Sequence, residues 1–422
     1  MAGHVVLDMK SMLLFAACLL AGPVIPETLE QRVADVLRLT PLVDGHNDIP
    51  WTVRTRFNNR LEDLDFGSDL TRIEVPTHTD IPRLRRGQVG GQFWSVYVPI
   101  QEYGGGSEYT QLVIEQIDLV HRMVDRYADT FELAYTAADV RRIHASGKIA
   151  SLIGIEGGHA INDSLAVLRR MYQLGARYMT LTHSKGLRWA DSATDKVRHN
   201  GLTAFGEAVV REMNRLGMLV DLSHVSPDTM RDAIRVSEGP VIFSHSSAYA
   251  VVPHQRNVPD DVLELVRENN GVVMVTFYPA YVSEATRRYF IEATAELERL
   301  QAEFSEEEVR RRVQDWQQAH PLPRPTLAQV ADHIDYIRGV AGIDHIGIGA
   351  DYDGMPPGPV GLEDVSTYPA LLVELLKRGY SDHDIGKIAG GNILRVMRDV
   401  ELVAERIAEQ RLPLKVGTPD VD

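Results

Sequence analysis

The strongest constraint on the fold of this 422-residue chain is an alternation of short apolar runs with amphipathic segments. Eight runs have the length and composition of buried strands, and segments of helical periodicity such as 111–129 and 227–236 separate them. Strands that alternate with helices pair in parallel, and eight of them indicate closure into a (β/α)8 TIM barrel. The predicted strands are 42–45, 91–98, 149–155, 177–181, 218–222, 241–244, 272–277 and 345–350.

An open doubly wound sheet is the competing architecture. Such a sheet normally carries a glycine-rich phosphate-binding turn after an early strand. Here the pair Gly90-Gly91 precedes its strand instead, which disfavours that fold. The charged segment 282–320 predicts a helical insertion before the last strand, and we expect it to be a peripheral lid or a dimer contact. The predicted single domain spans 26–410.

Residues 1–25 resemble a secretory signal sequence. Lys10 precedes an apolar stretch at 12–22 that is too short to span a bilayer as a helix. We therefore expect an exported protein, either periplasmic or anchored by a lipid on Cys18, with a cytoplasmic protein as the alternative. The mature chain should contain no transmembrane helix, and 411–422 should form a polar tail.

Charge and cysteine content exclude several kinds of site. The chain has 59 acidic against 44 basic residues and a formal net charge of −15, which argues against nucleic acid or an anionic membrane as the main partner. Its one cysteine, Cys18, lies in the signal-like segment, so the folded body has no disulfide and no thiolate zinc site. Histidine and carboxylate must hold any metal, which suits a catalytic centre.

Side chains that bind metals stand at the ends of several predicted strands. His46 and Asp48 are two residues apart, so on a strand they point to the same side. Glu156, His224 and His245 end or follow three further strands. Since the carboxyl ends of barrel strands meet on one face, we predict two metal ions bridged by Glu156. For each histidine taken alone, a hydrogen-bonded core residue remains the alternative.

Three further residues suit roles around such a centre. His183 ends the fourth predicted strand and would stabilise a developing oxyanion, unless it only anchors the following loop. Arg256 follows the sixth strand and would pair with a substrate carboxylate, with a surface helix-capping arginine as the alternative. Asp351 ends the last strand and would move a proton or hold an ammonium group, and Asp353 is its rival.

Longer motifs surround these residues. They are VDGHND at 43–48, GGQFWSVY at 90–97, GIEGGH at 154–159, LTH at 181–183, DLSHVS at 221–226, FSHSS at 243–247, RNVPDD at 256–261, GADYDG at 349–354 and GLEDVS at 361–366. Together they resemble the membrane (renal) dipeptidase family from about Pro41 to Val396. The resemblance implies an amidohydrolase-like barrel that holds two zinc ions.

The resemblance also implies the ligands of each ion. His46 and Asp48 would bind one zinc ion, His224 and His245 the other, and Glu156 would bridge them.

Around the ions, the resemblance implies the groups that meet the substrate. His183 would polarise the scissile carbonyl, Arg256 would take the substrate carboxylate, Asp351 would serve the amine end and proton transfer, and Tyr278 would add a contact.

The expected reaction is hydrolysis of L-L and L-D dipeptides by a hydroxide that bridges the two ions. Opening of β-lactams, lactones or N-acyl amino acids on the same centre is the alternative, followed by a one-metal deaminase and a non-catalytic scaffold.

The missing body cysteines and the polar C-terminus differ from mammalian members and suggest a bacterial relative. A homodimer is implied by the resemblance. Lys185 and Arg188 predict a preference for acidic substrate side chains.

Overall fold

The computed structural model describes residues 1–3 and 28–414. Most of the predicted signal segment at 1–25 and most of the predicted tail at 411–422 therefore lie outside the described residues. Among the described helices, none combines the length and the apolar character that crossing a membrane requires.

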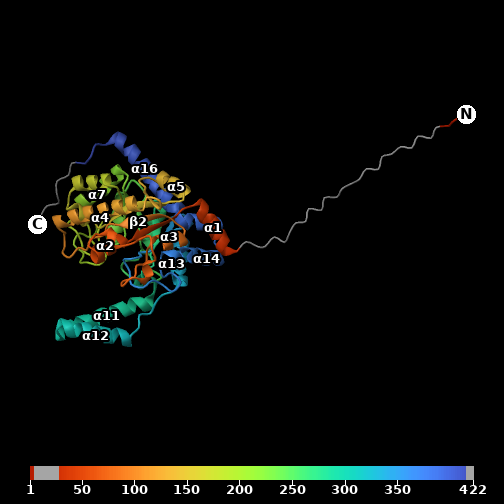
Figure 1. Ribbon diagram of the computed structural model, residues 1–422. Coiled ribbons are helices and arrows are strands. Elements are labelled where there is room, and N and C mark those ends of the chain that lie inside the picture. The colour runs from red at the N-terminus through yellow and green to blue at the C-terminus, as the bar shows by residue number, and fades with distance from the viewer. Residues whose placement is uncertain (4–27, 415–422) are drawn as a thin grey trace.

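Eight parallel strands close into a barrel surrounded by helices (Figure 1). Each strand pairs with its neighbour, and pairing of β2 with β4 closes the ring. The barrel strands are β1 (Leu42–Asn47), β2 (Val89–Ser95), β4 (Ile149–Glu156), β5 (Ala176–Thr180), β6 (Leu219–Asp221), β7 (Ile242–Phe243), β8 (Val272–Val275) and β9 (Ile346–Ile348). The predicted TIM barrel is confirmed, and the doubly wound sheet is excluded.

One strand was not predicted from the sequence. β3 (Phe131–Leu133) pairs in parallel with the first residues of β4 and lies outside the closed ring. Only Phe131 of its three residues is buried. Three residues are too few for an apolar run or for an alternation that would indicate a strand.

Burial explains why the barrel strands were visible in the sequence. Every residue of β1, β2 and β4 is buried, because side chains fill the barrel interior and helices cover its outer face. Such strands appear as continuous apolar runs, and each run ends where polar residues enter the loops. The carboxyl ends of the strands therefore carry the polar groups of the molecule's interior.

The outer helices begin at well-defined caps. α8 (Pro227–Val236) starts with Pro227 at its first position, and the Ser226 hydroxyl accepts a hydrogen bond from the Thr229 backbone N–H. This early start keeps the loop after β6 short. The other helices of the body are α1 (Leu29–Leu39), α2 (Ile49–Phe57), α3 (Ile81–Arg86), α4 (Ser107–Arg126), α5 (Ala137–Ala145), α6 (Leu165–Gln173), α7 (Ala204–Leu216), α9 (Asp260–Glu268), α13 (Leu327–Val340), α14 (Tyr368–Lys377), α15 (Asp382–Gly386) and α16 (Asn392–Gln410).

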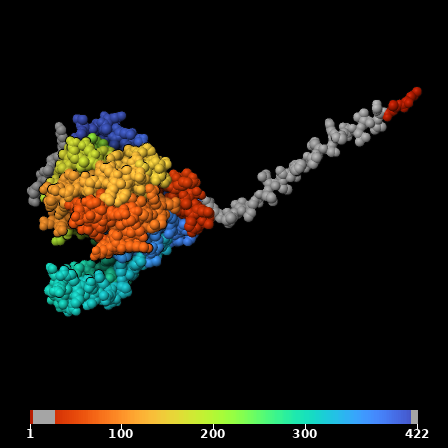
Figure 2. Space-filling view, viewed as in Figure 1, coloured from red at the N-terminus to blue at the C-terminus, as the bar shows by residue number. Residues whose placement is uncertain are grey.

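The predicted insertion forms a helical hairpin that projects from the barrel. The short helix α10 (Pro279–Val282) follows β8 and leads into α11 (Glu284–Glu303) and α12 (Glu306–Ala319). Figures 1 and 2 show this pair as a lobe set apart from the body. α12 buries only Val309, which agrees with its largely charged sequence. Its role as a lid or dimer contact stays a prediction.

Candidate metal centre

Seven side chains predicted to bind metal or to act on the reacting bond converge at the carboxyl end of the barrel. They form three overlapping groups, and within each group the possible ligand atoms lie within 4.8 Å of one another. The groups are His46, Glu156 and His245, then Glu156, His183 and His224, then His46, Asp48 and Asp351. The ends of β1 and β4 and the loops after β1, β5, β6, β7 and β9 supply these residues, so the fold itself assembles the cluster.

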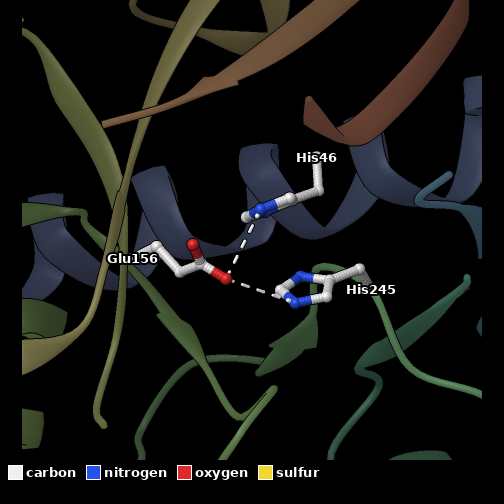
Figure 3. Close-up of side chains that lie close together, drawn as sticks. All are labelled: His46, Glu156 and His245. Carbon is white, nitrogen blue, oxygen red and sulfur yellow. Dashed lines mark ion pairs between the residues drawn. The ribbon is translucent and has the colours of Figure 1, made fainter. Parts of the chain in front are cut away.

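Glu156 is the centre of this arrangement. Its Oε1 atom lies 3.5 Å from Nε2 of His46, 3.0 Å from Nε2 of His224 and 3.4 Å from Nε2 of His245. Nε2 of His183 is 3.8 Å from the same oxygen. Figure 3 shows His46 of β1 and His245, which follows β7, pointing toward this carboxylate. One carboxylate oxygen thus faces four imidazole nitrogens.

A hydrogen bond behind His46 fixes which nitrogen faces the centre. The Tyr178 hydroxyl donates to the carbonyl of Gly45 at 3.3 Å, and it lies 2.9 Å from Nδ1 of His46. Because the hydroxyl proton is already used, Nδ1 must be the donor in this second contact. When the ring is neutral, Nε2 therefore carries the lone pair, and this atom is buried without a hydrogen-bond partner. A buried lone pair of this kind fits a metal ligand.

Two of the converging residues adopt unusual backbone conformations. His224 has a φ of 68° and Asp351 a φ of 72°, both in the left-handed region that non-glycine residues rarely occupy. The Asp351 N–H donates to the carbonyl of His46 at 3.2 Å, which ties the end of β9 to β1. These turns aim both side chains into the cluster rather than along their loops.

Asp48 lies beside His46 and has an open oxygen. Its Oδ2 atom is 3.2 Å from Nε2 of His46, and its buried Oδ1 has no hydrogen-bond partner. Gly354 leaves room for this carboxylate, since a Cβ there would lie 2.1 Å from Asp48 Oδ2 and 2.7 Å from Asp351 Oδ1.

Gly354→Ala is therefore expected to lower metal content and turnover by at least about tenfold, because the methyl group displaces a ligand carboxylate. Metal analysis and kinetics check this. Gly339→Ala is the matched control, since a Cβ there meets nothing within 4 Å. Wild-type metal content in the Gly354 variant would contradict the assignment of Asp48.

Burial shifts the ionisation of the cluster. It raises the pKa of Glu156 to about 8, and it lowers the pKa values of His183, His224 and His245 well below the usual range. Burial also opposes a charge on His46, but the neighbouring carboxylates Asp48 and Glu156 outweigh it and raise the pKa of His46 to about 10. Three neutral imidazoles beside carboxylates are ligands that suit a divalent cation.

Metal binding to the metal-free protein is expected to release protons and to weaken as the pH falls. Glu156 and His46 have raised pKa values, so both hold a proton near neutral pH, and a bound cation requires both to lose it. Affinity should therefore rise with pH through about 8, the pKa of Glu156, and on to about 10, the pKa of His46. Calorimetric titration in two buffers of different ionisation enthalpy measures the released protons. Equal heats and a pH-independent affinity would contradict this.

A cavity of about 370 Å³ opens onto the cluster, and Arg256 forms part of its wall. Arg256 is only 1% exposed, so it is not a surface capping residue. Its guanidinium donates over 3.4 Å to the Ser246 hydroxyl and over 3.3 Å to the His245 carbonyl, while Nε has no partner. Within the described part of the chain, no carboxylate forms an ion pair with it. A buried cation without a counter-ion is suited to an anionic ligand.

Aromatic side chains complete the cavity, and the sequence had indicated only Tyr278 among them. Tyr278 stacks on Tyr281 with ring centres 4.3 Å apart, and the Arg256 guanidinium lies 5.3 Å from the Tyr281 ring. The Tyr97 ring lies 4.7 Å from His183 and 5.2 Å from Trp51. Aromatic residues usually belong to the core, so they gave no signal of a site in the sequence.

Asp353, the alternative to Asp351 for proton transfer, faces the cavity but is hydrogen-bonded to a neighbouring loop. Its Oδ1 accepts a 2.7 Å hydrogen bond from the His78 N–H, and it belongs to none of the three ligand groups. Lys185 and Arg188 do not line the cavity, and Arg188 pairs with Asp163 at 2.6 Å. The expected preference for acidic substrates thus finds no support in these two cations.

Residues 30–411 match the family model described as membrane dipeptidase, peptidase family M19. The chain belongs to the membrane dipeptidase family. A family relative, dipeptidase aclJ of Aspergillus oryzae, is 44% identical over 387 residues, which cover 90% of this chain and 82% of the relative. The predicted family and the prediction of a metallo-dipeptidase are therefore confirmed.

Solved structures agree with the fold of the family. The probable dipeptidase PvdM from Pseudomonas aeruginosa matches with a TM-score of 0.75 at 23% identity, covering 89% of this chain and 99% of the other. A metallopeptidase from Rhodobacter sphaeroides, solved with a phosphinate mimic of L-Ala-D-Ala, matches with a TM-score of 0.69 at 24% identity, covering 86% and 99%. The bacterial origin expected from the sequence stays a prediction, because the 44% identical relative is fungal.

Proposed function

We propose that this enzyme is a binuclear zinc dipeptidase that hydrolyses L-L and L-D dipeptides. The observation that carries the proposal is the convergence of four imidazole Nε2 atoms on one oxygen of Glu156. The unpaired Arg256 in the same cavity supports a substrate with a free carboxylate.

In this proposal, His46 and Asp48 hold one ion, His224 and His245 hold the other, and Glu156 bridges them. The open Nε2 of His46 and the open Oδ1 of Asp48 support the first pair. Imidazole and carboxylate are ligands that zinc accepts in catalytic sites. When bound, the two ions would polarise the scissile carbonyl and lower the pKa of a shared water molecule toward neutrality.

The remaining side chains would bind the substrate and move protons. Arg256 would pair with the substrate carboxylate, and the Tyr278 ring beside it would contact the same end. Neutral His183 would donate a hydrogen bond to the oxyanion that develops on the carbonyl. Burial raises the pKa of Asp351 well above its usual range in the metal-free protein. In the reaction, this carboxyl would take up a proton and pass it to the departing amine.

The size of the cavity supports a limit to short substrates. With a volume of about 370 Å³, it accommodates a dipeptide whose carboxylate lies against Arg256. A tripeptide would have to place an extra residue either between the reacting bond and Arg256 or at the amine end beside Asp351. The enzyme should therefore discriminate strongly against longer peptides.

The test is metal analysis of the purified protein together with turnover of L-L dipeptides, L-D dipeptides and tripeptides. Two zinc ions per chain and cleavage of dipeptides alone are the expected results. Metal-free protein that stays inactive after zinc is added would overturn the proposal. Equal turnover of dipeptides and tripeptides would overturn the role of the cavity in limiting length.

A second candidate is hydrolysis of N-acyl amino acids or β-lactams, with lactones as a further class. N-acyl amino acids and many β-lactams carry a carboxylate near the amide, which Arg256 would accept in the same way. They lack the free amine that Asp351 would serve in a dipeptide. Including them in the same assay separates the candidates. Export through residues 1–25 and a homodimer remain predictions.

A further inference from the structure

A buried chain of hydrogen bonds lies behind His245, on the side that faces away from Glu156. The Ser244 hydroxyl oxygen is 2.9 Å from Nδ1 of His245 and 2.6 Å from Oδ2 of Asp221. Asp221 and Ser244 are fully buried, and His245 is 1% exposed. The proposed reaction uses neither Asp221 nor Ser244.

The donors around Asp221 determine the direction of this chain. Besides the Ser244 hydroxyl, Asp221 accepts the Thr180 hydroxyl at 2.5 Å and the backbone N–H groups of Ser223 at 3.1 Å and Ser244 at 2.8 Å. With four donors directed at it, Asp221 acts as an acceptor. The Ser244 hydroxyl therefore gives its single proton to Asp221 and accepts one from Nδ1 of His245.

This direction leaves the Nε2 lone pair of His245 on the side of the centre. Nε2 lies 3.4 Å from Glu156 Oε1 and 2.9 Å from Nε2 of His224. Asp221 ends β6 and Ser244 follows β7, so the same hydrogen bond also joins the two strands whose loops carry His224 and His245. These hydrogen bonds thus fix both the tautomer of His245 and the distance between His245 and His224.

We propose that Asp221 and Ser244 are positioning residues that set the metal affinity of the subsite formed by His224 and His245. The inference rests on the proposed binuclear function. A carboxylate that acts through a hydroxyl increases the basicity of the ligating nitrogen and fixes its tautomer. Behind His46, Tyr178 instead donates to a neutral backbone carbonyl. The histidines of the two subsites therefore have different supporting residues.

The experiment titrates the metal-free full-length chain with zinc in the presence of a competing chromophoric chelator. Ser244→Ala should bind one of its two ions about 10- to 100-fold more weakly, with the other ion unchanged. Tyr178→Phe should instead weaken mainly the other ion. Ser247→Ala is the matched control, because its hydroxyl is also fully buried but donates to the Thr276 carbonyl.

Wild-type affinities in Ser244→Ala, or an equal loss in Ser247→Ala, would overturn the inference. A wild-type chain that binds fewer than two ions would instead overturn the binuclear function on which it rests. A second measurement needs no variant of Ser244. Ring nitrogen chemical shifts of histidine-labelled, metal-free protein should show His245 protonated at Nδ1, with the resonance assigned by its absence in His245→Gln. Protonation at Nε2 alone would refute the relay.

Discussion

Replacing Glu156 with glutamine is expected to remove both the bound metal and the hydrolysis. The substitution keeps the shape of the side chain but exchanges a carboxylate for a neutral amide at the point where four Nε2 atoms converge. Neither ion would then have its shared anionic ligand. We expect kcat/KM to fall by at least about 10³-fold, since the ions supply the main electrophilic contribution to the reaction.

Zinc per chain and turnover of a simple dipeptide measure this effect. Glu115→Gln is the matched control, because Glu115 lies on α4 and pairs with Arg54 at 2.8 Å. That exchange should leave both quantities unchanged. A Glu156 variant that keeps two ions and turns over within tenfold of wild type would refute the bridging role.

Replacing Arg256 with alanine is expected to remove recognition of the substrate carboxylate. The guanidinium is buried and has no protein counter-ion in the described residues, so its charge is available to the substrate. Loss of one partner of such a buried pair costs about 2–5 kcal/mol, and we expect kcat/KM for a free dipeptide to fall by about 10²- to 10³-fold. Removal of an uncompensated buried charge should not lower the unfolding temperature.

A substrate that lacks the carboxylate isolates this effect. The wild-type enzyme should prefer a dipeptide to its C-terminal amide, whereas the Arg256 variant should treat the two alike. Arg188→Gln serves as control, because Arg188 pairs with Asp163 outside the cavity, and it should keep the wild-type preference. If the Arg256 variant retained the full preference for the free acid, another residue would have to bind the carboxylate.

The residues of the candidate metal centre stand out in the sequence because each lies at or just after the end of an apolar run. Glu156 ends a strand whose other residues are apolar or small, so a ligand-type side chain stands out there, and His46 follows the apolar pair Leu42-Val43. The closed barrel followed from the same runs, since eight strands with helices between them leave few arrangements. The three-residue strand β3 lacks that signal and became visible only through its pairing with β4.

The groups that support the ligands could not be predicted in this way. Tyr178 lies within a buried strand and looks like a core residue, and its partner His46 is 132 residues away in the sequence. Ser244 carries an ordinary hydroxyl whose direction depends on the four donors around Asp221. Such roles depend on distances between side chains of different strands, which a sequence pattern does not contain.

The projecting hairpin begins at the wall of the cavity. Two tyrosines of that wall belong to this region: Tyr278 immediately precedes α10, and Tyr281 lies within it. α11 starts at Glu284, two residues after the end of α10. The proposed metal ligands come from other strands, so a change in the hairpin that tilts α10 would reshape the aromatic wall and leave those ligands in place. Natural variation and laboratory evolution can therefore alter the range of accepted substrates in the hairpin while the hydrolytic chemistry is inherited unchanged.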